Sequence, residues 1–437
     1  MLVSACARTA QATPTPTANV SPSTTATATP TASPSPTAEC AARVLAGMSE
    51  EQRIGQLFLL GLANDQLGAA ETNAIRTYHF GSVWFVEQST AGADAVRRVA
   101  DAVQTLATVD TTANVRFFVA ANQEGGIIQS LSGPGFSTIP NALDQSTVDP
   151  LTLRVRAAQW GRELLAAGVN LNFAPVLDVV PVGTDAQNAP IGALRRGYGH
   201  DPATVSAHAI AFMKGMADAG IATTGKHFPG LGRVTGNTDF TAAVVDDVTT
   251  SDDPYLAPFR DAIAAGVPMV MVALAKYQKI DATELAVFSP TVMRQMLRVS
   301  LGFNGVVVSD DLGATVAVAN IVPADRAIGF LTAGGDLIVS KTVAPANAMA
   351  TAIAARASID ADRRRPPASI ASTTSSTDTH TRSAISCSVG DRRSSWPRSS
   401  MACWTLRYRS CTRRGRRTAQ PRSRKCRLSS PRMVGVA

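Results

Sequence analysis

Apolar residues in this chain are grouped into short, unbroken runs that are separated by longer stretches of mixed polarity. Unbroken apolar runs are typical of strands buried on both faces, as in a parallel sheet covered by helices. Eight such runs are present: Gln56–Leu62, Ser82–Glu87, Arg116–Ala121, Asn170–Val179, Ile221–Lys226, Pro268–Leu274, Gly305–Ser309 and Asp336–Ser340. We therefore predict a parallel sheet of eight strands.

Helical patterns fill the segments between these runs. The clearest are Ala91–Ala107, Leu151–Ala167, Pro202–Ala219, Tyr255–Ala265, Pro290–Val299 and Pro345–Ala357. Ser49, followed three residues later by Gln52, is a capping-box signature that opens a further helix. Strand and helix alternating eight times over about 300 residues predict an α/β fold of the (β/α)8 TIM barrel type. The alternative, a doubly wound open sheet, would rarely need eight strands, and no Gly-x-Gly-x-x-Gly motif follows an early run.

Composition divides the chain into three parts. Residues 1–40 are rich in Thr, Pro, Ala and Ser and contain too few large apolar residues to form a core, so we expect an extended tether. Residues 41–358 have the composition of a globular α/β domain. Residues 359–437 turn to Arg, Ser, Pro and Thr and lose the apolar pattern, so we expect a disordered basic tail.

The basic character of the chain comes from this tail alone. Residues 361–437 hold 18 of the 41 Lys and Arg and 3 of the 33 Asp and Glu, a net charge of +15, which leaves −7 for residues 1–360. A nucleic-acid-binding arm is one interpretation, but the Arg clusters show neither interleaved aromatic residues nor a repeat. The composition instead favours a shifted reading frame near residue 360, and nucleic acid is not an expected partner.

The first residues suggest the compartment. Leu2 to Cys6 resemble the end of a bacterial lipoprotein signal, in which small residues precede a cysteine that becomes lipidated. The charged and apolar segments of such a signal are not present before them, which favours a misplaced start over an accidental match. We therefore expect an extracytoplasmic protein, secreted or held at the cell surface by a lipid on Cys6.

Polar residues lie at the ends of four of the apolar runs or directly after them, where a barrel carries its active site. They are Asn122-Gln123-Glu124-Gly125-Gly126, Asp178, Lys226-His227-Phe228-Pro229-Gly230 and Ser309-Asp310-Asp311. Because no Cys/His spacing suits zinc and no Gly-rich loop suits a phosphate, we expect no metal and no cofactor. Carboxylates beside a lysine and a histidine indicate acid/base or nucleophilic chemistry.

These segments resemble the motifs of glycoside hydrolase family 3, in its single-domain β-N-acetylhexosaminidase branch. The resemblance rests on Gln123–Gly126, Asn172–Val179, Lys226–Gly230 and Phe303–Leu312, in the family's order and spacing, and it extends from about Met48 to about Ser340. It implies a retaining glycosidase with Asp310 as the nucleophile, because a carboxylate at a strand end is held rigidly enough to attack an anomeric carbon. Asp311 is expected to cap the next helix.

The resemblance also implies the substrate-binding residues. Lys226, His227 and Arg196, the last within Arg196-Gly197-Tyr198-Gly199, are expected to bind sugar hydroxyls. Asn122 and Glu124, in the motif after the third run, are further substrate-binding candidates. Asp178 is either a sugar contact or a hydrogen-bonded support for the loops.

Two departures from the family pattern affect the predicted chemistry. Asn122 stands where the branch has aspartate, and Ser130 where it has arginine, which weakens the assignment of the sugar as N-acetylglucosamine. The loop after Lys226–Gly230 has no histidine to serve as acid/base, and Asp239 occupies that position. Asp239 could act in its place if loop closure raised its pKa. Alternatively, Asn237-Thr238-Asp239 is an ordinary capped turn.

The leading functional hypothesis is removal of terminal β-linked N-acetylhexosamine, such as N-acetylglucosamine, from cell-wall glycosides including peptidoglycan fragments. A β-glucosidase of the same family would fit Asn122 and Ser130, although such members commonly add a sandwich domain. A lipoprotein that binds wall saccharides without cleaving them would fit the missing loop histidine. Retention of Asp310 argues for an enzyme.

Overall fold

The computed structural model describes residues 36–356, with side chains from residue 41 onward. The expected lipid anchor on Cys6 and the basic tail lie outside the described residues, as does most of the expected tether. Helix α1 (Pro36–Gly47) begins inside the segment predicted to be the tether.

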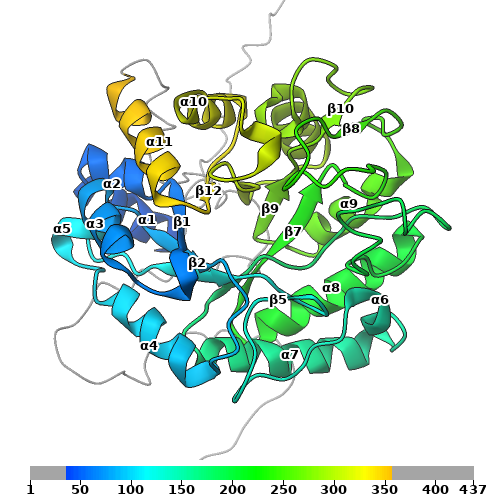
Figure 1. The fold of residues 1–437 in the computed structure, drawn as a ribbon, viewed down its shortest axis with the longest axis horizontal. Coiled ribbons are helices and arrows are strands. Elements are labelled where there is room, and N and C mark those ends of the chain that lie inside the picture. Colours follow the sequence, from blue (N-terminus) through cyan, green and yellow to red (C-terminus); the bar gives the residue numbers. More distant parts are fainter. Residues whose placement is uncertain (1–35, 357–437) are drawn as a thin grey trace, which may run out of the picture.

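Eight parallel strands form the centre of the molecule (Figure 1). They are β1 (Phe58–Leu62), β2 (Ser82–Phe85), β3 (Phe118–Ala121), β6 (Leu171–Asn172), β7 (Ala222–Phe228), β9 (Met269–Val272), β11 (Val306–Ser309) and β12 (Ile338–Ser340). The strands pair in the order β11-β9-β7-β6-β3-β2-β1-β12, and a parallel bridge between Val308 and Leu337 joins the two ends. The predicted (β/α)8 barrel is therefore confirmed, and the open-sheet alternative is wrong.

Helices surround the strands (Figure 1). They are α2 (Glu50–Gly55), α3 (Ala69–Tyr78), α4 (Ala93–Gln104), α5 (Val109–Thr112), α6 (Ala142–Gln145), α7 (Pro150–Ala166), α8 (Pro202–Asp218), α9 (Ala257–Ala264), the π-helix η4 (Thr291–Ser300), α10 (Pro323–Ala333) and α11 (Val343–Ala355). Single 3₁₀ turns lie at η1 (Ala63–Asp65), η2 (Pro254–Leu256), η3 (Ala286–Phe288) and η5 (Val316–Val318). None of the described helices is long and apolar enough to cross a bilayer.

Local sequence signals explain where several helices begin. Ser49 and Gln52 form the predicted capping box at α2, each side chain bonding to the other residue's backbone N–H. Asp149 and Asp201 cap α7 and α8 in front of a proline in the first turn. Gly215 lets these two helices approach, because a Cβ atom there would lie 2.3 Å from the carbonyl oxygen of Arg154.

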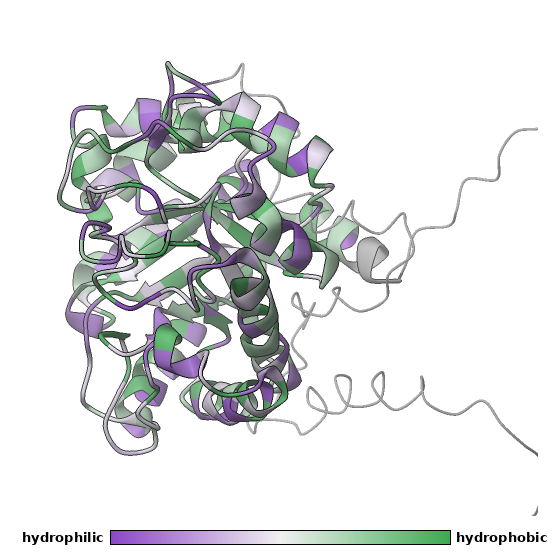
Figure 2. Cartoon of the chain, turned by 90° about the vertical axis from the view of Figure 1, so that its right-hand side faces the viewer, coloured by the Kyte–Doolittle hydropathy of each residue, from purple (hydrophilic) through white to green (hydrophobic). Residues whose placement is uncertain are grey.

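The core has two parts because side chains alternate along each strand. One buried cluster contains only strand and strand-end residues and fills the barrel: Leu59, Trp84, Ala120, Leu171, Phe173, Ala222, Met269, Met271, Val306, Val308, Leu337 and Val339. The larger cluster includes the alternate strand positions, such as Phe58 and Leu60, together with the inner faces of the helices. In Figure 2, hydrophobic residues accordingly run through the strands, while hydrophilic residues lie mainly on surrounding helices and loops.

The structure differs from the sequence prediction in the extent of one strand and in the presence of two small sheets. The fourth run was predicted to be extended from Asn170 to Val179, but regular pairing covers only Leu171–Asn172, with one further bridge at Val176. Pro175 lies between them and has no amide hydrogen for the ladder. Two small sheets were not predicted. One is the hairpin of β4 (Gln123–Gly125) with β5 (Ile128–Gln129), and the other is the pair of β8 (Val245–Asp246) with β10 (Lys276–Tyr277).

Candidate active site

Three of the predicted site residues lie where barrel strands end. Asn122 follows β3, Lys226 lies near the end of β7, and Asp310 follows β11. Asn122 and Asp310 each come two residues after a residue that fills the barrel, so their side chains turn toward the barrel axis. Asp310 interacts electrostatically with Lys226 and Asp239, so the charged groups share one mouth.

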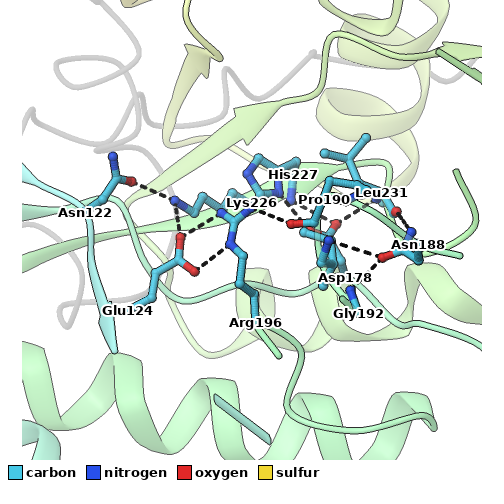
Figure 3. A network of polar contacts seen from close by, with 12 residues as sticks. Asn122, Glu124, Asp178, Asn188, Pro190, Gly192, Arg196, Lys226, His227 and Leu231 are labelled. Carbon is cyan, nitrogen blue, oxygen red and sulfur yellow. Dashed lines mark hydrogen bonds and ion pairs between the residues drawn. The ribbon is translucent and has the colours of Figure 1, made fainter. Parts of the chain in front are cut away.

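A buried ion network occupies one side of this mouth (Figure 3). Arg196 donates Nε and Nη2 to the two carboxylate oxygens of Glu124, at 2.9 and 2.8 Å, and Nη1 to the carbonyl oxygen of Pro190. The Nζ atom of Lys226 lies 2.7 Å from Oε1 of Glu124 and 2.8 Å from Oδ1 of Asn122. These contacts join segments between 72 and 104 residues apart in sequence into one rigid unit.

Burial and neighbouring charges have opposite effects on the pKa values of the groups in this network. Burial alone would raise the pKa of Glu124, but the positive charges of Arg196 and Lys226 outweigh it and lower that pKa to about 2. Burial lowers the pKa of Lys226 despite the nearby carboxylate. Glu124 is therefore ionised at neutral pH, which compensates the buried guanidinium and ammonium groups.

Asp178 holds His227 and the loop that follows it. Its Oδ2 atom lies 2.7 Å from Nδ1 of His227, and its Oδ1 atom accepts the backbone N–H groups of His227 and Leu231. The carboxylate is fully buried. Of the two predicted roles for Asp178, the hydrogen-bonded support is therefore present in the structure (Figure 3).

Asn188 is a structural residue of the site that sequence reasoning missed. Its Nδ2 atom donates to the carbonyl oxygens of Leu231 and Val234, and its Oδ1 atom accepts the N–H groups of Ile191 and Gly192. It thereby fastens the loop after β7 to the loop that carries Arg196. No motif or run contains Asn188, so the sequence offers no signal for it.

Asp310 and Asp311 have separate tasks. The half-buried Asp310 accepts the N–H of Asp311 at Oδ1, and its own N–H donates to the carbonyl oxygen of Val272. Asp311 accepts the N–H groups of Gly313, Ala314 and Lys341. The prediction that Asp311 caps the next helix is wrong, because helical structure starts only after Thr315. Asp311 instead connects the turn after β11 to the end of β12.

Asp239 lies on the loop after β7, which is bonded to the segment following Asp310. The carbonyl oxygens of Thr238 and Asp239 accept the N–H groups of Ala317 and Val316. Asn237 accepts the N–H of Asp239 through Oδ1 and that of Phe240 through its carbonyl oxygen, so the predicted capped turn is present. Asp239 is exposed at the surface, and partial desolvation by its surroundings, followed by the negative charge of Asp310, raises the pKa of its carboxyl group.

The site residues differ in what they leave free for a ligand. The side-chain polar atoms of Glu124, Arg196 and Asp178 are engaged with other residues, so their direct contact with sugar stays a prediction. Lys226 makes two of its three hydrogen bonds within the network. Within residues 41–356, no hydrogen bond is formed by Nε2 of His227 or Nδ2 of Asn122.

The two departures from the family pattern are neighbours. The N–H of Ser130 donates to the carbonyl oxygen of Asn122 at 2.9 Å. The two positions at which the family pattern has charged residues are thus joined through the backbone, and both carry neutral side chains here. Among the described residues, no group of three or more His, Cys, Asp or Glu side chains could hold a metal ion.

Comparison with known proteins identifies similar chains. Residues 49–364 match the family model described as glycosyl hydrolase family 3 N terminal domain. A beta-hexosaminidase of Stenotrophomonas maltophilia is 33% identical over 296 residues, covering 65% of this chain and 82% of that protein. A beta-hexosaminidase of Vibrio cholerae is 37% identical over 224 residues, or 51% of this chain and 64% of that one.

Solved structures are also similar. The crystal structure of a beta-N-acetylhexosaminidase from Beutenbergia cavernae is 45% identical, with a TM-score of 0.72 over 74% of this chain and 96% of that chain. A family 3 beta-N-acetylglucosaminidase from a Paenibacillus species is 27% identical, with a TM-score of 0.68 over 80% of this chain and 65% of that chain.

Proposed function

The chain belongs to glycosyl hydrolase family 3 and is a glycosidase, and on that premise we propose that it removes terminal β-linked N-acetylglucosamine by a retaining mechanism. The observation that carries the proposal is geometric: Asp310 follows β11, and the loop carrying Asp239 is bonded through the carbonyl oxygens of Thr238 and Asp239 to the segment after Asp310. A retaining glycosidase needs two such carboxyl groups, one ionised and one protonated. The names of the similar proteins support the choice of sugar.

Asp310 is the nucleophile in this proposal. Its carboxylate attacks the anomeric carbon and forms a glycosyl ester as the bond to the leaving oxygen breaks. The N–H of Asp311 fixes one carboxylate oxygen, which leaves the other for attack. Water later cleaves the ester and returns Asp310 to its ionised form.

Asp239 is the acid and then the base. Its raised pKa favours the protonated form, which donates a proton to the leaving oxygen. Once Asp310 is esterified, the charge that raises this pKa is gone. The pKa of Asp239 then falls, which suits its second role of taking a proton from the attacking water.

The remaining residues bind and orient the sugar. Lys226, His227 and Asn122 offer hydrogen-bonding atoms to the hydroxyl groups of the ring. Glu124 holds Lys226 in place, and Asp178 holds His227, each through its carboxylate. Asn122 and Ser130, both neutral, favour the β-glucosidase alternative as the second candidate.

The cellular setting is part of the proposal. We place the enzyme outside the cytoplasmic membrane, secreted or anchored by a lipid on Cys6, acting on cell-wall glycosides such as peptidoglycan fragments. The Pro, Thr and Ser composition after Cys6 supports this placement, because it suits an extended tether at a surface.

The test is hydrolysis of an aryl β-N-acetylglucosaminide and an aryl β-glucoside by the full chain. We expect release from the first substrate, and a loss of about 10³-fold or more in Asp310→Asn. Asp94→Asn, an exposed aspartate on α4, should behave like the parent. Release from the glucoside alone would favour the β-glucosidase, and no release by folded protein would favour a saccharide-binding protein.

A further inference from the structure

Phe240 is an unusual residue on the surface of this protein. Its side chain is 79% exposed, whereas every other Phe, Tyr and Trp within residues 41–356 is buried or partly buried. Exposing an aromatic ring to water is unfavourable, and an isolated apolar surface residue needs no explanation unless its place suggests one. The position of Phe240 suggests a functional explanation, because Phe240 directly follows Asp239 in the sequence.

The backbone around Phe240 is held in position. The N–H of Phe240 donates to the carbonyl oxygen of Asn237 at 3.0 Å, which closes the turn. The carbonyl oxygen of Asp239 accepts the N–H of Val316, on the segment that follows Asp310. Phe240 therefore lies on a turn whose backbone is bonded to the segment that follows Asp310.

The position of the acid determines what lies next to Phe240. In the proposed mechanism, Asp239 protonates the oxygen that joins the cleaved sugar to the rest of the substrate. The group on the far side of that oxygen must lie beside Asp239. Consecutive Cα atoms are about 3.8 Å apart, so Phe240 is the nearest exposed aromatic residue along the chain that this group could contact.

We propose that Phe240 forms a binding platform for the leaving-group sugar. A pyranose ring presents a face of C–H groups, and an exposed aromatic ring offers a matching apolar surface. Val316, the first residue of η5, is 37% exposed and adds apolar surface next to Asp239, whose carbonyl oxygen accepts its N–H. This inference rests on the proposed function, since it takes Asp239 as the acid.

The platform implies that the cleaved sugar and the leaving-group sugar are recognised by different kinds of contact. Lys226, His227 and Asn122 are polar and read the hydroxyl pattern of the cleaved sugar, so discrimination there is strict. An apolar face instead recognises the shape of a ring and tolerates changes in its substituents. The enzyme should therefore accept leaving-group sugars that differ in their substituents, provided that they present a flat ring.

The test compares two substrates with the same cleaved sugar. N-acetylglucosaminyl fluoride has no leaving-group sugar, whereas the β-1,4 disaccharide of N-acetylglucosamine has one. In Phe240→Ala, the ratio of kcat/KM for the disaccharide to kcat/KM for the fluoride should fall by about tenfold or more, mainly through KM for the disaccharide. Phe240→Trp should keep the ratio, and Phe240→Leu should be intermediate.

Leu151→Ala is the matched control, because Leu151 is 70% exposed at the start of α7, on the outer layer of helices. It should leave the ratio unchanged, and thermal unfolding of every variant should match that of the parent. An unchanged ratio in Phe240→Ala, or an equal loss on both substrates, would overturn the inference alone. Failure of the parent protein to hydrolyse the fluoride would overturn the proposed function and this inference together.

Discussion

The imidazole Nδ1 of His227 lies 2.7 Å from Oδ2 of Asp178, while Oδ1 of the same carboxylate accepts the backbone N–H of His227. One buried carboxylate thus holds both the ring and the backbone of His227. With Nδ1 donating to Asp178, the ring leaves Nε2 as its remaining hydrogen-bonding atom. Asp178 therefore acts as a positioning residue for His227.

Asp178→Asn should lower kcat/KM by about tenfold and the free energy of unfolding by about 1–3 kcal/mol. Three N–H groups donate to the Asp178 carboxylate: the backbone N–H groups of His227 and Leu231, and Nδ1 of His227. An amide has no charge and only one acceptor oxygen, so the imidazole ring and the loop after β7 are held less firmly. Steady-state kinetics and denaturant unfolding would show both effects. Asp185→Asn is the matched control, because its carboxylate faces His200 at 3.7 Å on the surface. Equal behaviour of the two variants would contradict the positioning role.

Removing the carboxyl group of Asp239 should affect substrates according to their leaving group. A disaccharide needs a proton on the departing oxygen, so Asp239→Asn should lose about 10²-fold or more in kcat/KM. A 2,4-dinitrophenyl glycoside has a leaving group that departs without a proton. Its rate in the first step, formation of the glycosyl ester, should therefore fall far less in Asp239→Asn. A loss of the same size on both substrates would count against Asp239 as the acid. Asp247→Asn, an exposed residue further along the chain, serves as the control.

Most of the fold could be predicted from the apolar runs, because each run became a strand of the barrel. Strand ends could not be predicted as well, since pairing depends on neighbouring strands and on single residues such as Pro175. The segment Pro290–Val299 was predicted to be helical, which is confirmed, although the kind of helix, the π-helix η4, was not predicted. Amphipathic spacing does not distinguish bonds to residue i−4 from bonds to residue i−5.

The motifs identified residues that the structure brings to one mouth, but they did not show how these residues are connected. Glu124 and Arg196 are 72 residues apart and pair with each other, a contact that no local pattern reveals. Arg196 was predicted to bind sugar, which stays a prediction, and the sequence did not reveal that its donors bond to Glu124 and Pro190. The tie between Asn188 and the loop after β7 is equally invisible in the sequence.

The low pKa of Glu124 predicts how stability depends on pH. Its folded pKa of about 2 lies below its ordinary value of 4.5, so the stabilisation is fully present above about pH 4.5 and is lost as pH falls toward 2. Glu124→Gln should remove this part of the acid-induced loss of stability. It should also lower the free energy of unfolding at neutral pH by about 3–5 kcal/mol, because it leaves two buried cations without their partner.

Denaturant unfolding of the parent and Glu124→Gln between pH 2 and pH 7 would measure both effects. Glu284→Gln, at an exposed position, should follow the parent throughout. If the stability of Glu124→Gln fell with pH as steeply as that of the parent over this range, the ion network would not be the source of the dependence.

Replacing Asp239 by histidine should move the alkaline limb of the activity profile. In the parent, the acid must be protonated, so kcat/KM should fall as pH rises through the raised pKa of Asp239. Histidine has an ordinary pKa of about 6.5, and the negative charge of Asp310 favours its protonated form, so Asp239→His should lose activity only above about pH 6.5. Asp239→Glu should keep the limb near that of the parent, because the titrating group stays a carboxyl. Profiles of kcat/KM against pH would measure this. An alkaline limb at the same pH in all three proteins would show that a group other than Asp239 supplies the proton.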